Sequence, residues 1–423
     1  MINVDQINPP GQDATVADGE GWMTSGQACE RLGVRPQTLY AYVSRGLLRS
    51  VKLDGRSRYD PVQVDALARR TARGRRPGRF EVTVDTEVTR LARDGRCWYR
   101  GVDVADLIGR WSFERTAEWL WSGVDRGEPE RPWAPDPVAL ARSRAAVAAL
   151  DAAGCDGDGA GAGAVSPGDR LRTAVAALGV GLAPSDPAAR APAAARTLVA
   201  TLVEALPRVG PAPRRDASIA ARLWPRLAPR RPTAAEVAAL DGVLVAMADH
   251  ELATSTLAVR VATSTGAGLD AALLAGLATL SGPLHGAAAG PVRDLLVDAR
   301  ARGAAVAVEA AVAGGRRAPG TGHVVYERVD PRTAPMLAAV APAVAPARWA
   351  TVAAVRAELD RRGCVPVNCD FALGAMIEAT GMVDGAAEVA FAVARTAGWI
   401  AHAREESRHR LRYRARAIYT GPR

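Results

Sequence analysis

A long run of small apolar residues, 252–280, constrains the fold of this chain more than any other feature. It is rich in Ala, Leu, Val and Thr and carries few charges, a pattern typical of buried helix rather than of a solvated face. His250 in Ala-Asp-His-Glu precedes the run and His285 in Gly-Pro-Leu-His-Gly follows it, although the chain has only five histidines. Histidines at both ends of a buried helical hairpin would face a shared interior. A structural histidine bonded to a carboxylate is the simpler alternative for each of them.

The composition favours a mainly α-helical protein. Apolar residues make up 48% of the 423 residues but aromatic residues only 5%, so Ala, Val and Leu must build the core. Alanine has the strongest helix propensity, and long runs such as 137–153 and 334–362 are typical of helices. The length predicts more than one domain. We expect little sheet beyond the first hundred residues.

The charge and the cysteines narrow the classes of function. The net charge is +9, and Lys52 is the only lysine, so nearly all of the positive charge comes from arginine. This balance suits nucleic acid and equally a polyanionic small molecule. The five cysteines are odd in number and scattered, without metal-ligand spacing, which predicts a reducing cytoplasm and no structural metal site. We expect no secretory signal and no run of membrane-spanning length.

The N-terminal residues predict a small module behind a disordered tail, 1–22. Within residues 23–68, a short helix over 26–32 is followed by a second helix over 36–48 that begins with proline. Residues 51–59 then predict two strands around an Asp-Gly turn. This order of elements resembles the winged helix-turn-helix of MerR-type regulators and excisionases.

The resemblance of this module implies contacts with DNA. Four side chains at the start of the second helix would face the major groove: Arg35, Gln37, Thr38 and Tyr40. Arg56 and Arg58 on the strands would contact phosphates. An arginine-rich linker, 69–79, follows and marks the domain boundary. The alternative is a module of this shape that docks or dimerises without DNA.

Beyond the linker, six short motifs occur in one order. They are Ala-Asp-His-Glu (248–251), Gly-Pro-Leu-His-Gly (282–286), Gly-Thr-Gly-His (320–323), Asp-Pro-Arg (330–332), Asn-Cys-Asp-Phe (368–371) and Arg-Ala-Arg-Ala-Ile-Tyr-Thr-Gly (414–421). Each motif alone has an ordinary explanation, such as a Gly-His turn or an aspartate at a helix start. Together, in this order and spacing, they resemble the citrate synthase family over residues 80–423.

The resemblance implies a mainly α-helical, citrate synthase-like fold with two domains. The large domain would comprise residues 80–286 and 391–423, and the small domain about 287–390. The active site would lie between them, so the domains would close on oxaloacetate and exclude water. An obligate homodimer is also implied.

The resemblance further implies which residues carry the chemistry. Asp370 would be the general base at the methyl carbon of acetyl-CoA, and His285 would donate a hydrogen bond to the thioester oxygen. His323 would polarise the keto group of oxaloacetate. The substrate's carboxylates call for cationic and hydrogen-bonding partners, and the resemblance supplies four: His250, Arg332, Arg395 and, from the partner subunit, Arg414. No cofactor and no metal are implied, because acetyl-CoA is a co-substrate.

Several positions depart from the family pattern. Ala287 and Ala289 follow His285 where the usual sequence has glycine and asparagine, so an amide near the thioester is missing. Val324 stands where many bacterial members have arginine. Two further departures are Leu373 for a common serine and Ala415 for proline. None of them removes a proton-transfer residue, but the alanines could alter selectivity for the acyl group.

Three functions remain open on the sequence. The first is a citrate synthase, and the second is a 2-methylcitrate synthase that uses propionyl-CoA and shares all of these motifs. The third is a DNA-binding regulator whose synthase-like domain senses a metabolite without turnover. The retained general base, Asp370, argues against a pure sensor, whereas an enzyme with an appended DNA-binding module accommodates both halves of the chain.

Overall fold

The computed structural model of the chain comprises two compact units, Met1–Asp85 and Thr86–Arg423. The described residues are 22–32, 34, 36–44, 47–53, 55–64, 67, 83–92, 95–155, 165–179, 192–214, 216–282, 285–286, 288–326, 328–409 and 412–414. Several predicted features lie outside them: the tail up to residue 21, the linker 69–79, Arg35, Ala287 and Ala415.

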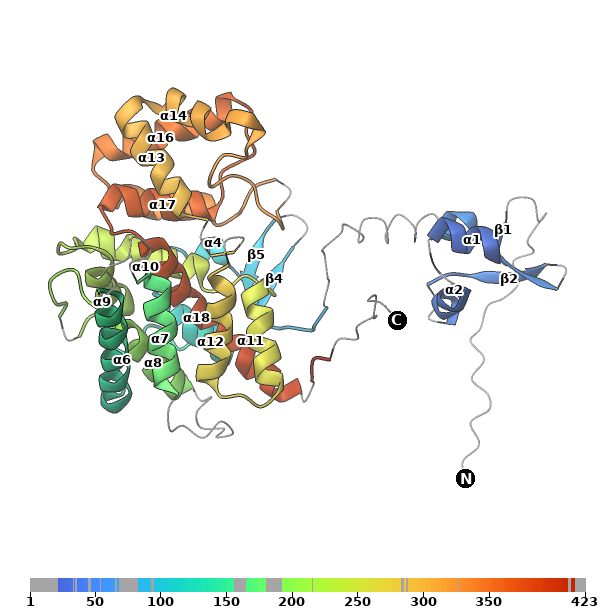
Figure 1. Cartoon of the computed structure of the whole chain (residues 1–423), viewed down its shortest axis with the longest axis horizontal. Helices are drawn as coiled ribbons and strands as arrows, with labels where there is room; N and C mark the ends of the chain where they lie inside the picture. The colour runs from blue at the N-terminus through green and yellow to red at the C-terminus, as the bar shows by residue number, and fades with distance from the viewer. Residues whose placement is uncertain are drawn as a thin grey trace. The chain divides into compact units, whose positions relative to one another are not determined.

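The first unit is a small helical module on a three-stranded sheet (Figure 1). Its elements are β1 (Met23–Thr24), α1 (Ser25–Leu32), α2 (Pro36–Ser44), β2 (Ser50–Leu53) and β3 (Arg56–Tyr59). The strands are antiparallel in the order β1-β3-β2. Ala28, Leu39 and Tyr59 are buried together in its core. The predicted pair of helices followed by a two-stranded wing is therefore confirmed.

The second helix of this unit is shorter than the sequence predicted. It ends at Ser44 instead of continuing to residue 48. The Leu47 N–H donates to the Tyr42 carbonyl oxygen at 2.9 Å. A hydrogen bond that spans six residues in this way is typical of a helix C-terminus. The chain then turns so that Leu48 is buried in the small core instead of extending the helix.

The second unit is mainly α-helical, as predicted, with one small antiparallel sheet of order β4-β5-β6 (Figure 1). Its strands are β4 (Thr89–Leu91), β5 (Cys97–Tyr99) and β6 (Val102–Asp103). Its first helices are α4 (Val104–Leu107), α5 (Phe113–Ser122), α6 (Pro137–Cys155), α7 (Pro167–Leu178), α8 (Pro192–Ala205), α9 (Ile219–Leu227) and α10 (Ala234–Met247). The later helices are α11 (Thr254–Ser264), α12 (Leu269–Leu280), α13 (Gly290–Arg302), α14 (Ala304–Val312), α15 (Thr333–Val340), α16 (Pro346–Arg361), α17 (Cys369–Thr380) and α18 (Ala386–His409).

Helix α18 is the centre of this unit. All residues from 392 to 403 are buried, which means that neighbours surround the helix on every side. Those neighbours are α5, α7, α8, α9, α10, α11, α12 and α17. Gly398 permits the closest approach, because a Cβ there would collide with the Ala248 carbonyl oxygen and with the Asp249 carboxylate. This contact fixes the chain just before His250 against the middle of α18.

The helices α13, α14 and α16 pack on one another and, together with α17, form a group in the upper part of the unit (Figure 1). Helix α17 also contacts α10, α15 and α18, so it joins this group to the rest of the core. The start of α17 therefore lies where the two groups of helices meet. None of the described helices combines the length and the apolarity that a membrane crossing requires.

Residues 80–89 alternate in sequence as a strand would, but the strand that forms here lies later than this pattern predicts. Described residues 83–88 have no strand pairing, and β4 begins only at Thr89. The backbone here has other partners: the Glu87 N–H donates to the Glu405 carboxylate at 2.7 Å, and the Val88 carbonyl accepts from Arg100 at 2.9 Å. The Glu405 carboxylate on α18 thus accepts a backbone hydrogen bond that a neighbouring strand would otherwise accept.

Candidate active site

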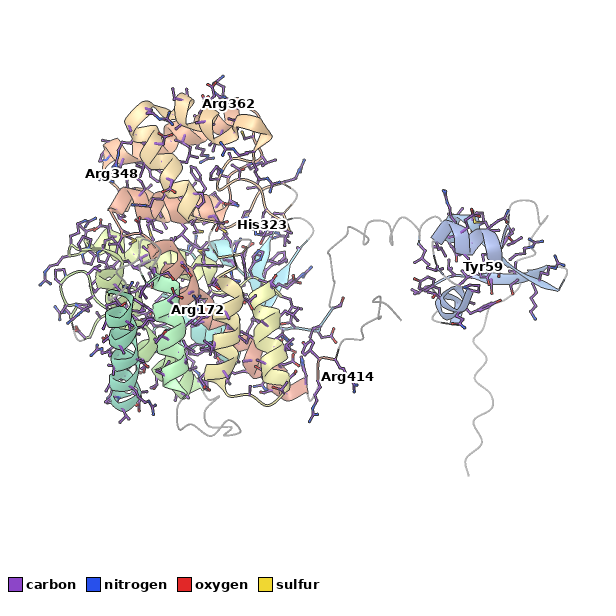
Figure 2. The ribbon with its side chains drawn as sticks, in the orientation of Figure 1. Tyr59, Arg172, His323, Arg348, Arg362 and Arg414 are labelled. Atoms are coloured by element: carbon purple, nitrogen blue, oxygen red, sulfur yellow. The ribbon has the colours of Figure 1, made fainter. Side chains whose placement is uncertain are left out.

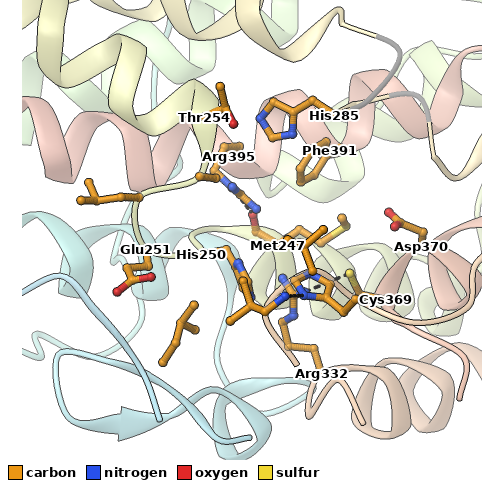
Figure 3. A pocket seen from close by; sticks show the side chains of 16 residues that line it. Met247, His250, Glu251, Thr254, His285, Arg332, Cys369, Asp370, Phe391 and Arg395 are labelled. Carbon is orange, nitrogen blue, oxygen red and sulfur yellow. Dashed lines mark hydrogen bonds between the residues drawn. The ribbon is translucent and has the colours of Figure 1, made fainter. Parts of the chain in front are cut away.

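A pocket of about 340 Å³ lies where α10 and α12 end and α17 begins (Figure 3). Besides apolar residues such as Leu91, Met247 and Phe391, it is lined by six of the seven residues that the sequence predicted for a synthase site: His250, His285, His323, Arg332, Asp370 and Arg395. They come from four separate loops and helix starts and from the middle of α18. Folding therefore brings together side chains that are far apart along the chain.

Arg414 is the predicted residue that does not line this pocket. Its side chain is exposed near the end of the described chain, and Figure 2 shows it apart from His323. The preceding Tyr413 is fixed, because its hydroxyl donates to Glu406 at 3.1 Å. Within one chain Arg414 has no place in the pocket, and its assignment to a partner's site stays a prediction.

The loop that carries His323 is held against the start of α17. Asn368 caps that helix through its side-chain oxygen, which accepts from the Asp370 N–H at 3.0 Å, and its amide group donates to the Gly322 carbonyl at 2.7 Å. Gly320 has a φ of 69°, and a Cβ there would collide with Phe371. One asparagine and a tight glycine turn thus hold the His323 loop at the start of α17, where Asp370 lies.

Asp370 lies in the first turn of α17, and its side chain has no hydrogen-bond partner among the described residues. Burial raises the pKa of Asp370 to about 6, although the positive charge of Arg332 opposes this rise. A carboxylate with this pKa is ionised at neutral pH yet basic enough to accept a proton. These are the properties that a general base requires.

The hydrogen bonds of His285 define which of its nitrogens is protonated. Trp399 Nε1–H donates to the Ser255 hydroxyl oxygen at 3.3 Å, so that hydroxyl is free to donate to His285 Nε2 at 2.8 Å. Burial lowers the pKa of His285, and the ring is therefore neutral at pH 7. In a neutral ring whose Nε2 accepts, Nδ1 carries the proton and is the donor.

His323 has the opposite arrangement. The Val325 N–H donates to His323 Nδ1 at 3.0 Å, so Nε2 carries the proton of the neutral ring. Burial and the charge of Arg332 lower the pKa of His323 to about 4. His285 and His323 are therefore both neutral imidazoles in the pocket, each with one defined N–H donor.

The two arginines of the pocket are fixed by buried partners. Arg332 makes a bidentate pair with Asp330, at 2.9 Å from Nε and 2.8 Å from Nη2, and Nη2 also donates to Cys369 Sγ at 3.1 Å. Burial alone would raise the pKa of Asp330, but Arg332 lowers it strongly. Arg395 donates from Nε to the Met247 carbonyl at 3.0 Å. Both guanidinium groups keep donors for an anionic ligand.

Tyr326 and Ser255 are the site residues that the sequence analysis missed. Tyr326 Oη lies 2.9 Å from His250 Nε2, and Ser255 bonds to His285. Neither belongs to one of the six motifs. The sequence contains one weak signal for Tyr326: it lies in the short loop between the Gly-Thr-Gly-His motif, which ends at His323, and the Asp-Pro-Arg motif, which begins at Asp330.

The arrangement defines a class of protein. It is a multi-helical protein whose pocket combines cations for an anionic ligand, two neutral imidazole donors and a carboxylate poised as a base. Such a set can bind carboxylates, remove a proton from carbon and stabilise a developing oxyanion.

Comparison with known proteins gives the family. The sequence profile described as citrate synthase, C-terminal domain, matches residues 80–416. The chain belongs to the citrate synthase family. It also carries a match to a helix-turn-helix domain over residues 22–72, and both predicted resemblances are thereby confirmed.

Three similar proteins show the degree of sequence and structural similarity. A Bacillus subtilis protein named citrate synthase 2 is 31% identical over 274 residues, which cover 61% of this chain and 73% of that protein. A 2-methylcitrate synthase of Mycobacterium tuberculosis is 28% identical over 338 residues, covering 76% and 84%. The crystal structure of citrate synthase from Pyrobaculum aerophilum superposes with a TM-score of 0.65 at 26% identity, over 81% of this chain and 91% of that one. Other mycobacterial relatives, at 34% identity, are matched over only about half of their length (53%).

The helix-turn-helix unit presents most of the predicted DNA-contact residues at its surface. Gln37, Thr38 and Tyr40 are exposed on α2, and Arg56 is exposed at the start of β3. Arg58 is half-buried on the same strand. Their surface positions are compatible with contact to a ligand, and the DNA contact itself stays a prediction.

Proposed function

We propose that the chain condenses an acyl-CoA thioester with oxaloacetate, as a citrate synthase does. The observation that carries this proposal is Asp370, a half-buried carboxyl with a pKa raised to about 6 in the same pocket as His285 and His323. Arg332 and Arg395 supply the cations that a dicarboxylate requires. Membership of the citrate synthase family supports the same chemistry.

The geometry supports a definite order of proton transfers. Asp370 would take a proton from the acyl carbon next to the thioester carbonyl, and the C–H electron pair would form an enolate. His285 Nδ1–H would donate to its oxygen. The enolate carbon would attack the keto carbon of oxaloacetate, and the new alkoxide would take the proton of His323 Nε2. Water would then cleave the thioester and release the CoA thiol.

The function is tested by thiol release from two thioesters. We expect purified protein with oxaloacetate to release free thiol from acetyl-CoA faster than from propionyl-CoA, measured as kcat/KM with a thiol reagent. The reverse preference would identify a 2-methylcitrate synthase, the activity in the name of the M. tuberculosis relative. Turnover of neither thioester would contradict the enzyme proposal and favour a sensor.

Arg414 extends the proposal to the oligomer. An exposed arginine one residue after the anchored Tyr413 suits a contact outside its own chain. We propose that it completes the oxaloacetate site of a partner subunit in a homodimer. Activity of Arg414→Ala should recover when it is mixed with inactive Asp370→Asn chains, because one site of the mixed dimer then has both residues.

A second candidate function is DNA binding by the N-terminal unit. The exposed face of α2 and the basic strands β2 and β3 support it, with Lys52 and Arg56 exposed on the wing. We expect the full chain to shift genomic DNA fragments in gels, and a chain that lacks residues 1–79 to lose the shift but keep its thiol release. A shift that survives this deletion would place DNA binding elsewhere.

A further inference from the structure

Tyr326 occupies a position that links two of the pocket imidazoles. Its hydroxyl lies 2.9 Å from His250 Nε2, and its ring centroid lies 5.4 Å from that of His250 and 4.8 Å from that of His323. The guanidinium carbon of Arg332 lies 5.9 Å from the same ring. Tyr326 is only 6% exposed and does not line the pocket, so it stands behind the groups that face a ligand.

The direction of the hydrogen bond follows from the chemistry of its two partners. The Tyr326 hydroxyl shares a hydrogen bond of 2.9 Å with His250 Nε2. A phenolic O–H is a stronger donor than an imidazole N–H, and an unprotonated imidazole nitrogen is a stronger acceptor than a phenolic oxygen. The phenolic proton is therefore given to His250 Nε2.

This assignment fixes the role of the other nitrogen of His250. Burial lowers the pKa of His250 far below its ordinary value, so the ring is neutral and has one N–H. Because Nε2 accepts, that proton is on Nδ1. Nδ1 has no hydrogen-bond partner among the described residues, and His250 lines the pocket. A neutral ring of the other tautomer would present a lone pair to an anionic ligand and repel it.

We propose that Tyr326 is a positioning residue that holds His250 with its Nδ1–H directed to the keto acid and restrains the rings of His250 and His323. The consequence for oxaloacetate rests on the proposed function, whereas the tautomer itself does not. Tyr326 thereby sets the affinity for the keto acid without touching it, and it leaves the thioester site at His285 unaffected.

Tyr326→Phe tests this role, because phenylalanine keeps the ring and removes only the hydroxyl. We expect the KM for oxaloacetate to rise about tenfold, the effect of one lost hydrogen bond, while the KM for the acyl-CoA stays within about twofold. Ser143→Ala is the matched control, since it removes a buried hydroxyl that bonds only to the Ala174 carbonyl on the far side of the unit. An unchanged KM for oxaloacetate, or equal rises for both substrates, would overturn the proposal.

Nitrogen-15 NMR of the histidine rings tests the tautomer without turnover. We expect His250, assigned by comparison with His250→Asn, to be protonated on Nδ1 in the wild type and to become a mixture of tautomers in Tyr326→Phe. Protonation of Nε2 in the wild type would overturn the proposal even in an active enzyme. If the nitrogen shifts are as expected but no thiol is released, the result would contradict the proposed function alone and leave the role of Tyr326 intact.

Discussion

Replacing Asp370 with asparagine is expected to lower kcat for thiol release about 10³-fold, within the range that one general base contributes. Asparagine has the same shape but cannot accept the proton from the acyl carbon. The change breaks no described side-chain hydrogen bond, because the Asp370 carboxylate makes none, so the fold should be preserved. Steady-state kinetics with saturating oxaloacetate and acyl-CoA measure the effect.

The matched control for this variant is Asp360→Asn on the exposed surface of α16. It removes one carboxylate from the same group of helices without touching the pocket, and its kcat should equal that of the wild type. Oxaloacetate binding, followed by calorimetry, should persist in Asp370→Asn because the arginines remain. A variant that keeps more than about a tenth of the wild-type kcat would show that Asp370 is not the base.

The same carboxyl predicts the acid limb of the pH profile. Burial raises the pKa of Asp370 to about 6, and only the ionised form can accept a proton. The value of kcat/KM should therefore be level above pH 7 and fall about tenfold for each pH unit below 6. The remaining activity of Asp370→Asn should lack this limb. A wild-type profile that is flat from pH 7 to 5 would exclude Asp370 as the group that titrates.

The motifs predicted most of the residues that line the pocket, because each motif is a short, recognisable sequence that contains one ionisable or hydrogen-bonding side chain. His285, His323 and Asp370 could be named from the sequence, and the fold brings them to one pocket. The supporting contacts could not be predicted. Tyr326 meets His250, and Ser255 meets His285, only through packing between segments that no local pattern connects.

The errors in the predicted elements have a similar cause. Alternation over residues 80–89 suggested a strand, but the backbone there bonds to the side chain of Glu405, which lies more than three hundred residues further along the chain. The second helix of the small unit ends at Ser44, and Leu48 beyond it is buried in the small core instead of extending the helix. In both places a tertiary contact overrode a local preference.

The run 252–280 contains the largest surprise, a fully buried arginine at Arg260. The pattern predicted a buried helix, and Arg260 is a charge within it. The guanidinium instead bonds to Glu406 at 2.8 Å, to Glu405 at 2.6 Å and to His402 Nδ1 at 2.7 Å. Because arginine can only donate, His402 must carry its proton on Nε2, which faces Asp249 at 3.3 Å. The network thus ends beside His250.

Replacing Arg260 with methionine is expected to lower the free energy of unfolding by about 3–5 kcal/mol, the cost of leaving buried charge without its partner. Methionine fills much of the same space, so the loss comes from the carboxylates of Glu405 and Glu406 and not from a cavity. Urea unfolding followed by circular dichroism measures it. Arg302→Met removes an arginine from an exposed ion pair with Asp298 and should leave the transition nearly unchanged.

A compensating substitution separates lost pairing from lost packing. If uncompensated charge is the cause, Arg260→Met with Glu406→Gln should recover a large part of the lost stability, because the neutral amide no longer needs a cation inside the core. If packing is the cause, the second substitution should add to the damage. The kinetics carry a further consequence: without Arg260, His402 loses the bond that defines its tautomer and with it the donor to Asp249. The KM for oxaloacetate should then rise in the single variant and stay high in the double variant, since restoring charge balance does not restore the bond to His402.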